Sequence, residues 1–120
     1  MAGRLPIHAS SSGLVLLAFG TRELQERVLA APLAPVSRET ITDAAVLRRK
    51  LAEVRRLGHA IAPGYIEAVS TGVAAPIRDE TGAVIAALSE VLPRDSPVDA
   101  PLAELHAAAR EIAAALHRIR

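Results

Sequence analysis

The sequence contains no cysteine and no tryptophan, and Phe19 and Tyr65 are its only large aromatic side chains. Without cysteine the chain can form no disulfide and offers no thiolate for catalysis or metal binding, which fits the reducing cytoplasm. Because hydrophobic residues still make up 51% of the chain, the core has to consist of alanine, valine, leucine and isoleucine. Such small side chains predict close approaches between helix and sheet backbones.

The sequence also lacks a large net charge and long hydrophobic runs. There are 14 Lys and Arg residues against 13 Asp and Glu, so a net charge of +1 attracts the chain neither to DNA nor to an anionic membrane. The longest apolar run, residues 14–19, is far shorter than the roughly 20 residues that span a bilayer. Because the N-terminus lacks a signal-peptide pattern, we predict a cytoplasmic protein without membrane contact. Its length suits a single domain.

Three helices are predicted in the first half of the sequence. Serines 10–12 can cap a short helix over residues 13–19, and Thr21 can cap a second helix that ends near Ala31. The clearest pattern starts at Thr42 or Asp43. Its apolar residues recur on one helical face until Gly58, which is typical of a helix end: Leu47, Leu51, Val54 and Leu57.

Strand patterns follow this helix. Residues 59–62, 72–78 and 83–91 predict three strands, and the last two are joined by a hairpin loop over residues 79–82. Both hairpin strands are nearly continuous in apolar residues, which predicts that they are covered on both faces or lie centrally in the sheet. A proline-rich connector over residues 93–101 precedes a last helix, residues 102–119. Its apolar seam consists of Leu102, Leu105, Ala109, Ile112, Leu116 and Ile119.

This order of elements predicts an α+β fold with a largely antiparallel sheet flanked by helices. The few predicted strands form too small a sheet to cover the apolar faces of two amphipathic helices. We therefore expect the sheet to be incomplete on its N-terminal side. We therefore treat residues 1–120 as a single domain from which strands are missing upstream.

No combination of residues in the sequence predicts catalysis. The four histidines show no metal-ligand spacing, no G-x-S-x-G motif accompanies the serines, and no glycine motif for phosphates occurs. His106 and His117 are expected to face solvent on the last helix, and His59 is expected to be structural. The basic residues at positions 48–56 are interpreted as a solvated helix face, because no aromatic side chain accompanies them for base stacking. We predict no enzyme, no metal and no cofactor.

Small residues on one predicted strand suggest a pocket instead. Gly72, Ala74 and Ala75, followed by Pro76, would leave space beside a buried strand. Ser89 is a lone hydroxyl within an apolar strand, so it either bonds a neighbouring carbonyl or contacts a ligand.

Four collinear stretches carry the motifs of one protein family. Residues 5–9 (LPIHA) with 13–18 (GLVLLA) resemble its LPLHATA-x-GKALLA segment. Residues 38–43 (RETITD) with Leu47, Leu51, Val54 and 58–60 (GHA) resemble RTITD…L…L…VR…GYA. Residues 74–79 (AAPIRD) and Gly82 resemble AAPVRD…G, and residues 86–89 (AALS) resemble AALSVSGP. Together these stretches resemble the effector-binding domain of IclR-family transcriptional regulators, and the match extends over nearly the whole chain.

This resemblance implies a GAF-like α/β domain of which residues 1–120 are the C-terminal two-thirds, without the winged helix-turn-helix that binds DNA. It also implies a pocket for a small organic-acid or aromatic effector. The positions that correspond to the family's pocket lining are Ser10, Ser11, Ser12, Gly13, Ala62, Gly72, Ser89 and Val91, and Tyr65 is a further polar candidate. Ser70 and Thr71 are further possible polar contacts.

Two functions from different classes follow. The chain is expected to be the sensing and oligomerisation portion of a bacterial regulator, as a homodimer or homotetramer, with DNA bound only through a domain absent from residues 1–120. The alternative is a homo-oligomeric interaction module, or a fragment that no longer binds an effector. Because polar residues usual in the family are replaced by Ala62 and Val91, a larger or more apolar effector fits better than a very small carboxylate.

Overall fold

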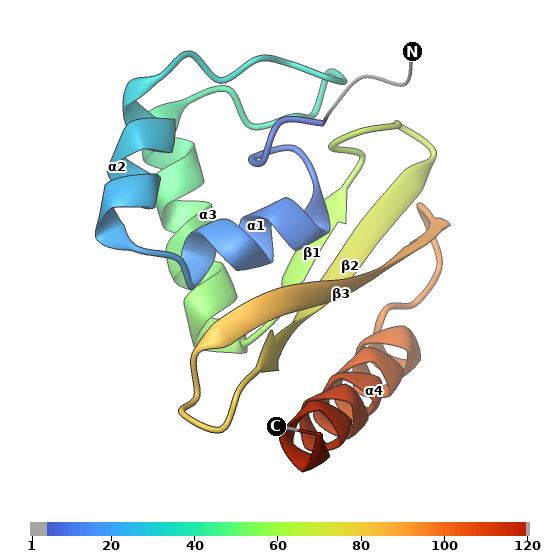
Figure 1. Ribbon diagram of the computed structural model, residues 1–120. Coiled ribbons are helices and arrows are strands. Elements are labelled where there is room, and N and C mark those ends of the chain that lie inside the picture. The colour runs from blue at the N-terminus through green and yellow to red at the C-terminus, as the bar shows by residue number, and fades with distance from the viewer. Residues whose placement is uncertain (1–4, 120) are drawn as a thin grey trace.

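The computed structural model describes residues 5–119 as a three-stranded antiparallel sheet with helices on both faces (Figure 1). The elements in chain order are α1 (Ser11–Ala18), α2 (Arg22–Ala30), α3 (Ala44–Leu57), β1 (Ala60–Pro63), β2 (Ser70–Arg78), β3 (Val84–Pro93) and α4 (Asp99–Arg118). The strands lie in the order β1-β2-β3. Helix α1 packs on one face of the sheet together with α3 and α2, whereas α4 covers the opposite face. The predicted α+β fold is confirmed.

Side-chain caps begin the first three helices where the sequence predicts them. Ser10 Oγ accepts from the amide of Gly13 at 2.9 Å, and Thr21 Oγ1 accepts from that of Leu24 at 3.1 Å. Of the two candidates before α3, Asp43 is the cap, because its Oδ1 accepts from two first-turn amides at 2.8 and 3.1 Å. Helix α3 ends at Gly58, whose φ of 80° is a left-handed conformation that glycine adopts without a steric penalty.

Strand register aligns small residues across the face that α1 covers. Ala62 on β1 lies opposite Gly72 on β2, which lies opposite Val91 on β3. One pleat further along, Ala74 of β2 lies between Ala60 and Ser89. Since alternate residues point to the same face of a sheet, these rows form the floor beneath α1.

Two hydrophobic clusters, one on each face of the sheet, form the core. The larger joins α1, α3 and the small sheet residues and contains Leu14, Val15, Leu17, Ala18, Leu33, Ile41, Leu47, Leu51, Val54, Ala60, Ala62 and Ala74. The smaller joins β2 to α4 and contains Val73, Ala75, Leu102 and Leu105. Fixing α1 between the sheet and α3 places the N-terminus of α1 over Gly72, which positions the site described below.

Two expectations about the hairpin and the last helix are wrong. Strand β3 is an edge strand with much of its length exposed, including Ile85 at 46% and Val91 at 70%. Only β2 is central, because burial depends on place in the sheet and not on the apolar content of a strand. Helix α4 begins at Asp99, before the predicted start, because Pro101 lies in its first turn, where the missing amide hydrogen costs nothing.

The apolar seam of α4 is buried only in its first half. Leu102, Leu105 and Ala109 pack inward, whereas Ile112 is 37% and Ile119 is 81% exposed. Among residues 5–119, none of the helices has the length and apolar character needed for a membrane span.

Candidate functional site

A cavity of about 180 Å³ lies where the N-terminus of α1 meets the sheet and the loop between β1 and β2. Its floor comes from the small residues of β1 and β2, and its outer side comes from β3. The lining residues are Leu5, Ala9, Ser10, Ser11, Ser12, Ala62, Ile66, Glu67, Ser70, Gly72, Ser89 and Val91. Close packing shapes it, since a Cβ on Gly72 would lie 2.9 Å from Ser11 Oγ.

Most residues predicted for the site line this one cavity: Ser10, Ser11, Ser12, Ala62, Gly72, Ser89 and Val91. Gly13 is not among the lining residues, because the backbone of residue 7 packs directly against it and separates it from the cavity. Tyr65 turns to the other side of its loop, where its ring lies 5.5 Å from Lys50 Nζ on α3. Ser70 lines the cavity, whereas Thr71, one residue on, is buried on the other face of β2.

Four lining residues were not predicted from the sequence. Leu5 and Ala9 precede α1, and Ile66 and Glu67 lie in the loop between β1 and β2. The turn at residues 63–64 indicates the loop but not which of its side chains face the cavity.

The polar groups of the cavity gather around the start of α1. The first amides of a helix have no partner within the helix, and together with the helix dipole they favour an anion there. Ser10 Oγ is already engaged by Gly13, so Ser11 and Ser12 supply the neighbouring hydroxyls. The exposed Glu67 adds a negative charge elsewhere on the wall, and Leu5, Ile66 and Val91 add apolar surface. This arrangement suits a molecule with one carboxylate and a compact apolar body.

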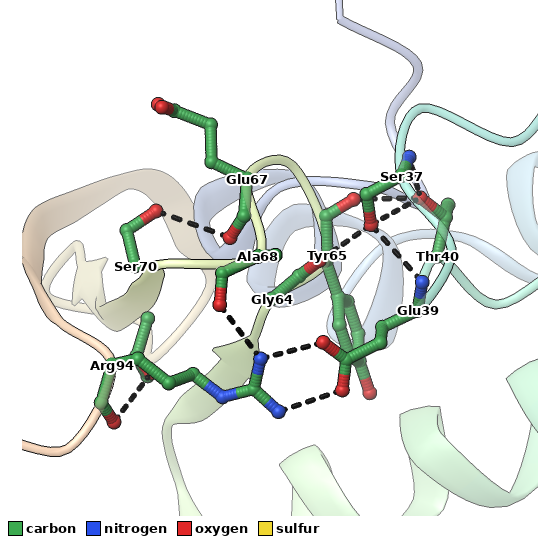
Figure 2. Close-up of polar contacts among 10 residues, drawn as sticks. Ser37, Glu39, Thr40, Gly64, Tyr65, Glu67, Ala68, Ser70 and Arg94 are labelled. Atoms are coloured by element: carbon green, nitrogen blue, oxygen red, sulfur yellow. Dashed lines mark hydrogen bonds and ion pairs between the residues drawn. The ribbon is translucent and has the colours of Figure 1, made fainter.

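The loop that carries Ile66 and Glu67 is held by hydrogen bonds from outside the cavity (Figure 2). Arg94, which follows β3, forms a bidentate ion pair with Glu39 at 2.5 and 2.6 Å and donates to the Ala68 carbonyl at 2.9 Å. Ser37 Oγ donates to the carbonyl of Gly64. The hydrogen bond from Arg94 holds the pKa of the Glu39 carboxyl below its usual value, so the pair is ionised at neutral pH.

The histidines have structural partners. His8 is buried, and its Nε2 lies 2.8 Å from the Ala34 carbonyl. His59 Nδ1 lies 3.1 Å from His106 Nε2. His106 is therefore half-buried on the side of α4 that faces the sheet, and the prediction that it faces solvent is wrong. Burial, and then the proximity of His106, lower the pKa of His59, while Glu53 opposes them. Within residues 5–119 no three His, Cys, Asp or Glu side chains are grouped as metal ligands.

The family model described as "Bacterial transcriptional regulator IclR C-terminal" matches residues 2–118. The chain belongs to the IclR family. It corresponds to the C-terminal part of these regulators, as the sequence motifs predicted, and the homologues are regulators and not enzymes.

Three relatives show the extent of the similarity. The structure of an IclR homolog from Microbacterium hydrocarbonoxydans, complexed with 4-hydroxybenzoate, is 52% identical with a TM-score of 0.92 and covers 100% of this chain and 49% of its own. A double mutant of the PobR inducer-binding domain from Acinetobacter, in complex with 3-hydroxybenzoic acid, is 30% identical with a TM-score of 0.83, covering 94% of this chain and 68% of its own. The transcriptional repressor AllR of Klebsiella pneumoniae is 33% identical over 90 residues, which are 74% of this chain and 33% of AllR. The chain therefore spans about a third of the length of AllR and about half of the length of the Microbacterium hydrocarbonoxydans protein.

Proposed function

We propose that the chain is the effector-sensing part of a cytoplasmic IclR-type regulator, and that the cavity at the N-terminus of α1 binds a single-ring aromatic monocarboxylic acid. The supporting observation is the cavity itself, which combines hydroxyls at a helix N-terminus with apolar walls. Its volume of about 180 Å³ suits one ring, since an engineered apolar cavity of about 150 Å³ binds benzene. The relatives crystallised with hydroxybenzoates support the same class of ligand.

In this proposal the carboxylate lies against Ser11 and Ser12, and the ring rests between Ala62 and Ile66. Glu67 makes a second negative group on the ligand unfavourable, so monocarboxylates bind better than dicarboxylates. Occupancy alters regulation only if the acid binds one assembly of the regulator more tightly than another. DNA binding would then come from the part of the relatives that lies outside the match.

Self-association is the remaining part of the proposal, as a homodimer or homotetramer. The exposed Ile112 and Ile119 at the end of α4 favour it, because they continue a seam that is buried in the first half of the helix. Sedimentation velocity across a concentration series tests this part. A strictly monomeric chain at all concentrations would contradict it while leaving acid binding intact.

Titration calorimetry and thermal shift with 4-hydroxybenzoate, 3-hydroxybenzoate, terephthalate and the neutral 4-hydroxybenzamide test the binding proposal. A binding acid at 100 times its Kd stabilises the fold by about 2.7 kcal/mol. The monocarboxylates should bind, and the amide and the dicarboxylate should bind at least tenfold more weakly. If the amide binds as well as the acid, the carboxylate assignment is wrong.

A variant with a built-in control separates binding from folding. Ser12→Asp adds a negative charge in the first turn of α1, which stabilises a helix but repels a carboxylate. Binding should be lost while Tm is kept or raised. Ala103→Asp adds the same charge to an exposed position on α4 and should bind like the wild type.

A further inference from the structure

We propose that the Arg94–Glu39 ion pair is a positioning device that sets the affinity of the cavity for aromatic acids from outside it. Neither residue lines the cavity. They act through the loop of residues 64–69, termed the wall loop, which joins β1 to β2 and supplies Ile66 and Glu67 to the lining. This inference rests on the proposed function.

The wall loop is closed at its base but has few bonds of its own. The amide of Gly64 donates to the Ser70 carbonyl at 2.9 Å, and the amide of Ser70 donates to the Glu67 carbonyl at 3.2 Å. These two bonds hold the ends of the loop together. They do not determine how far the loop leans toward α1, so its place as a cavity wall depends on contacts with other segments.

Those contacts come from three side chains that do not line the cavity (Figure 2). Ser37 donates to the Gly64 carbonyl at 2.5 Å, and Thr40 donates to the Tyr65 carbonyl at 2.6 Å. Arg94 donates to the carbonyl of Ala68 at 2.9 Å. Ser37 and Thr40 hold the start of the loop, so Arg94 alone among the three holds its far half, next to Glu67.

Arg94 can hold the loop because it is fixed itself. Its amide donates to the Val69 carbonyl at 2.8 Å, and its guanidinium is clamped by both oxygens of Glu39. A bidentate pair defines the plane of the guanidinium, which aims the second N–H of Arg94 Nη1 at the Ala68 carbonyl. The pair also packs flush on the loop, because a Cβ on Gly64 would overlap Glu39 Oε2 and lie 2.5 Å from Arg94 Nη1.

Both side chains remain partly exposed, at 33% for Arg94 and 42% for Glu39. Loss of the pair is therefore expected to release the loop without unfolding the domain. Release of the wall loop should lower the affinity for any ligand whose body rests against Ile66. It should not lower the affinity for a ligand that contacts only Ser11 and Ser12. The device thus affects aromatic acids selectively, which a merely structural role would not do.

The experiment measures Kd for 4-hydroxybenzoate and for propionate in the wild type, Arg94→Gln, Arg94→Lys and Glu39→Gln. We expect Kd for 4-hydroxybenzoate to rise about tenfold in Arg94→Gln, and less in Glu39→Gln, which removes the ionic clamp but not the guanidinium that donates to Ala68. Arg94→Lys, which keeps the charge but not the fork, should lie between wild type and Arg94→Gln. Kd for propionate should change less than twofold, and Glu26→Gln, which removes the exposed Arg22–Glu26 pair on α2, is the matched control.

Hydrogen exchange of the ligand-free proteins gives an independent readout. Amides of residues 64–70 should exchange faster in Arg94→Gln, while those of α3 keep their protection. If wild type binds 4-hydroxybenzoate and Arg94→Gln binds it equally, or if both acids weaken in parallel, the inference is overturned and the proposed function stands. If wild type binds no acid, the proposed function fails, and unchanged exchange in Arg94→Gln would show that the pair does not hold the loop either.

Discussion

Gly13→Ala sets two opposed effects against each other at the start of α1. Gly13 is the third residue of the helix, and alanine in a helix is favoured over glycine by about 1 kcal/mol. Helix propensity alone therefore predicts a more stable protein. The added Cβ, however, would overlap the Ile7 carbonyl oxygen and lie 2.8 Å from both the Ile7 carbonyl carbon and Ser10 Oγ.

The surrounding structure cannot yield easily to this Cβ. Ile7 belongs to a turn closed by the bond from the Ala9 amide to the Pro6 carbonyl, and the buried His8 ties this turn to Ala34. Overpacking of this kind costs about 1–3 kcal/mol, and disturbing the Ser10 cap adds about 1 kcal/mol. The steric terms exceed the propensity gain, so we expect a net destabilisation of about 1–3 kcal/mol.

Urea denaturation followed by circular dichroism at 222 nm measures this change, and calorimetry should show a lower Tm by roughly 3–5 °C for each kcal/mol. Gly82→Ala is the control, because no heavy atom lies within 4 Å of its added Cβ and only backbone strain of about 1 kcal/mol at φ 88° remains. A Gly13→Ala protein as stable as the wild type would refute the close packing of residue 13 on residue 7.

Two further predictions concern His59 and Asp43. Because the pKa of His59 is lowered in the fold, its contribution to stability is complete above the ordinary histidine value of about 6.5 and is lost as pH falls from there through the lowered pKa. Urea denaturation at pH 7.5, 6.5 and 5.5 should therefore show falling stability, with a shallower slope in His59→Asn, and equal slopes would contradict this. Asp43→Ala should lower the free energy of unfolding by about 1 kcal/mol through loss of the α3 cap. Thr42→Ala, one residue earlier, should change it by less than about 0.5 kcal/mol, and the reverse order of effects would show that the cap is assigned wrongly.

Features decided by neighbouring residues could be predicted from the sequence. The helix caps and the Gly58 helix end follow from local backbone chemistry, so their positions agree with the structure within one or two residues. The grouping of Ala62, Gly72 and Val91 around one cavity was predicted only through family resemblance, because strand register has no local signature.

Contacts between distant segments could not be predicted in this way. Glu39 and Arg94 are 55 positions apart, and His59 and His106 are 47 apart, and neither pair has a spacing motif. The exposure of β3 was missed for a related reason. A strand's burial depends on how many neighbours it has in the sheet, and an apolar sequence is compatible with both a central and an edge position.

The free edge of β3 has a consequence for handling the isolated chain. The strand is ten residues long, pairs with β2 on one side only, and carries a single charged residue, Glu90. Long apolar edges of this kind act as templates for adding a strand from another molecule. At high concentration the 120-residue chain should therefore aggregate edge to edge, with the growth of intermolecular β structure that infrared spectroscopy detects. A lysine in place of the exposed Ile85 or Val91 would suppress this growth and keep the domain in solution.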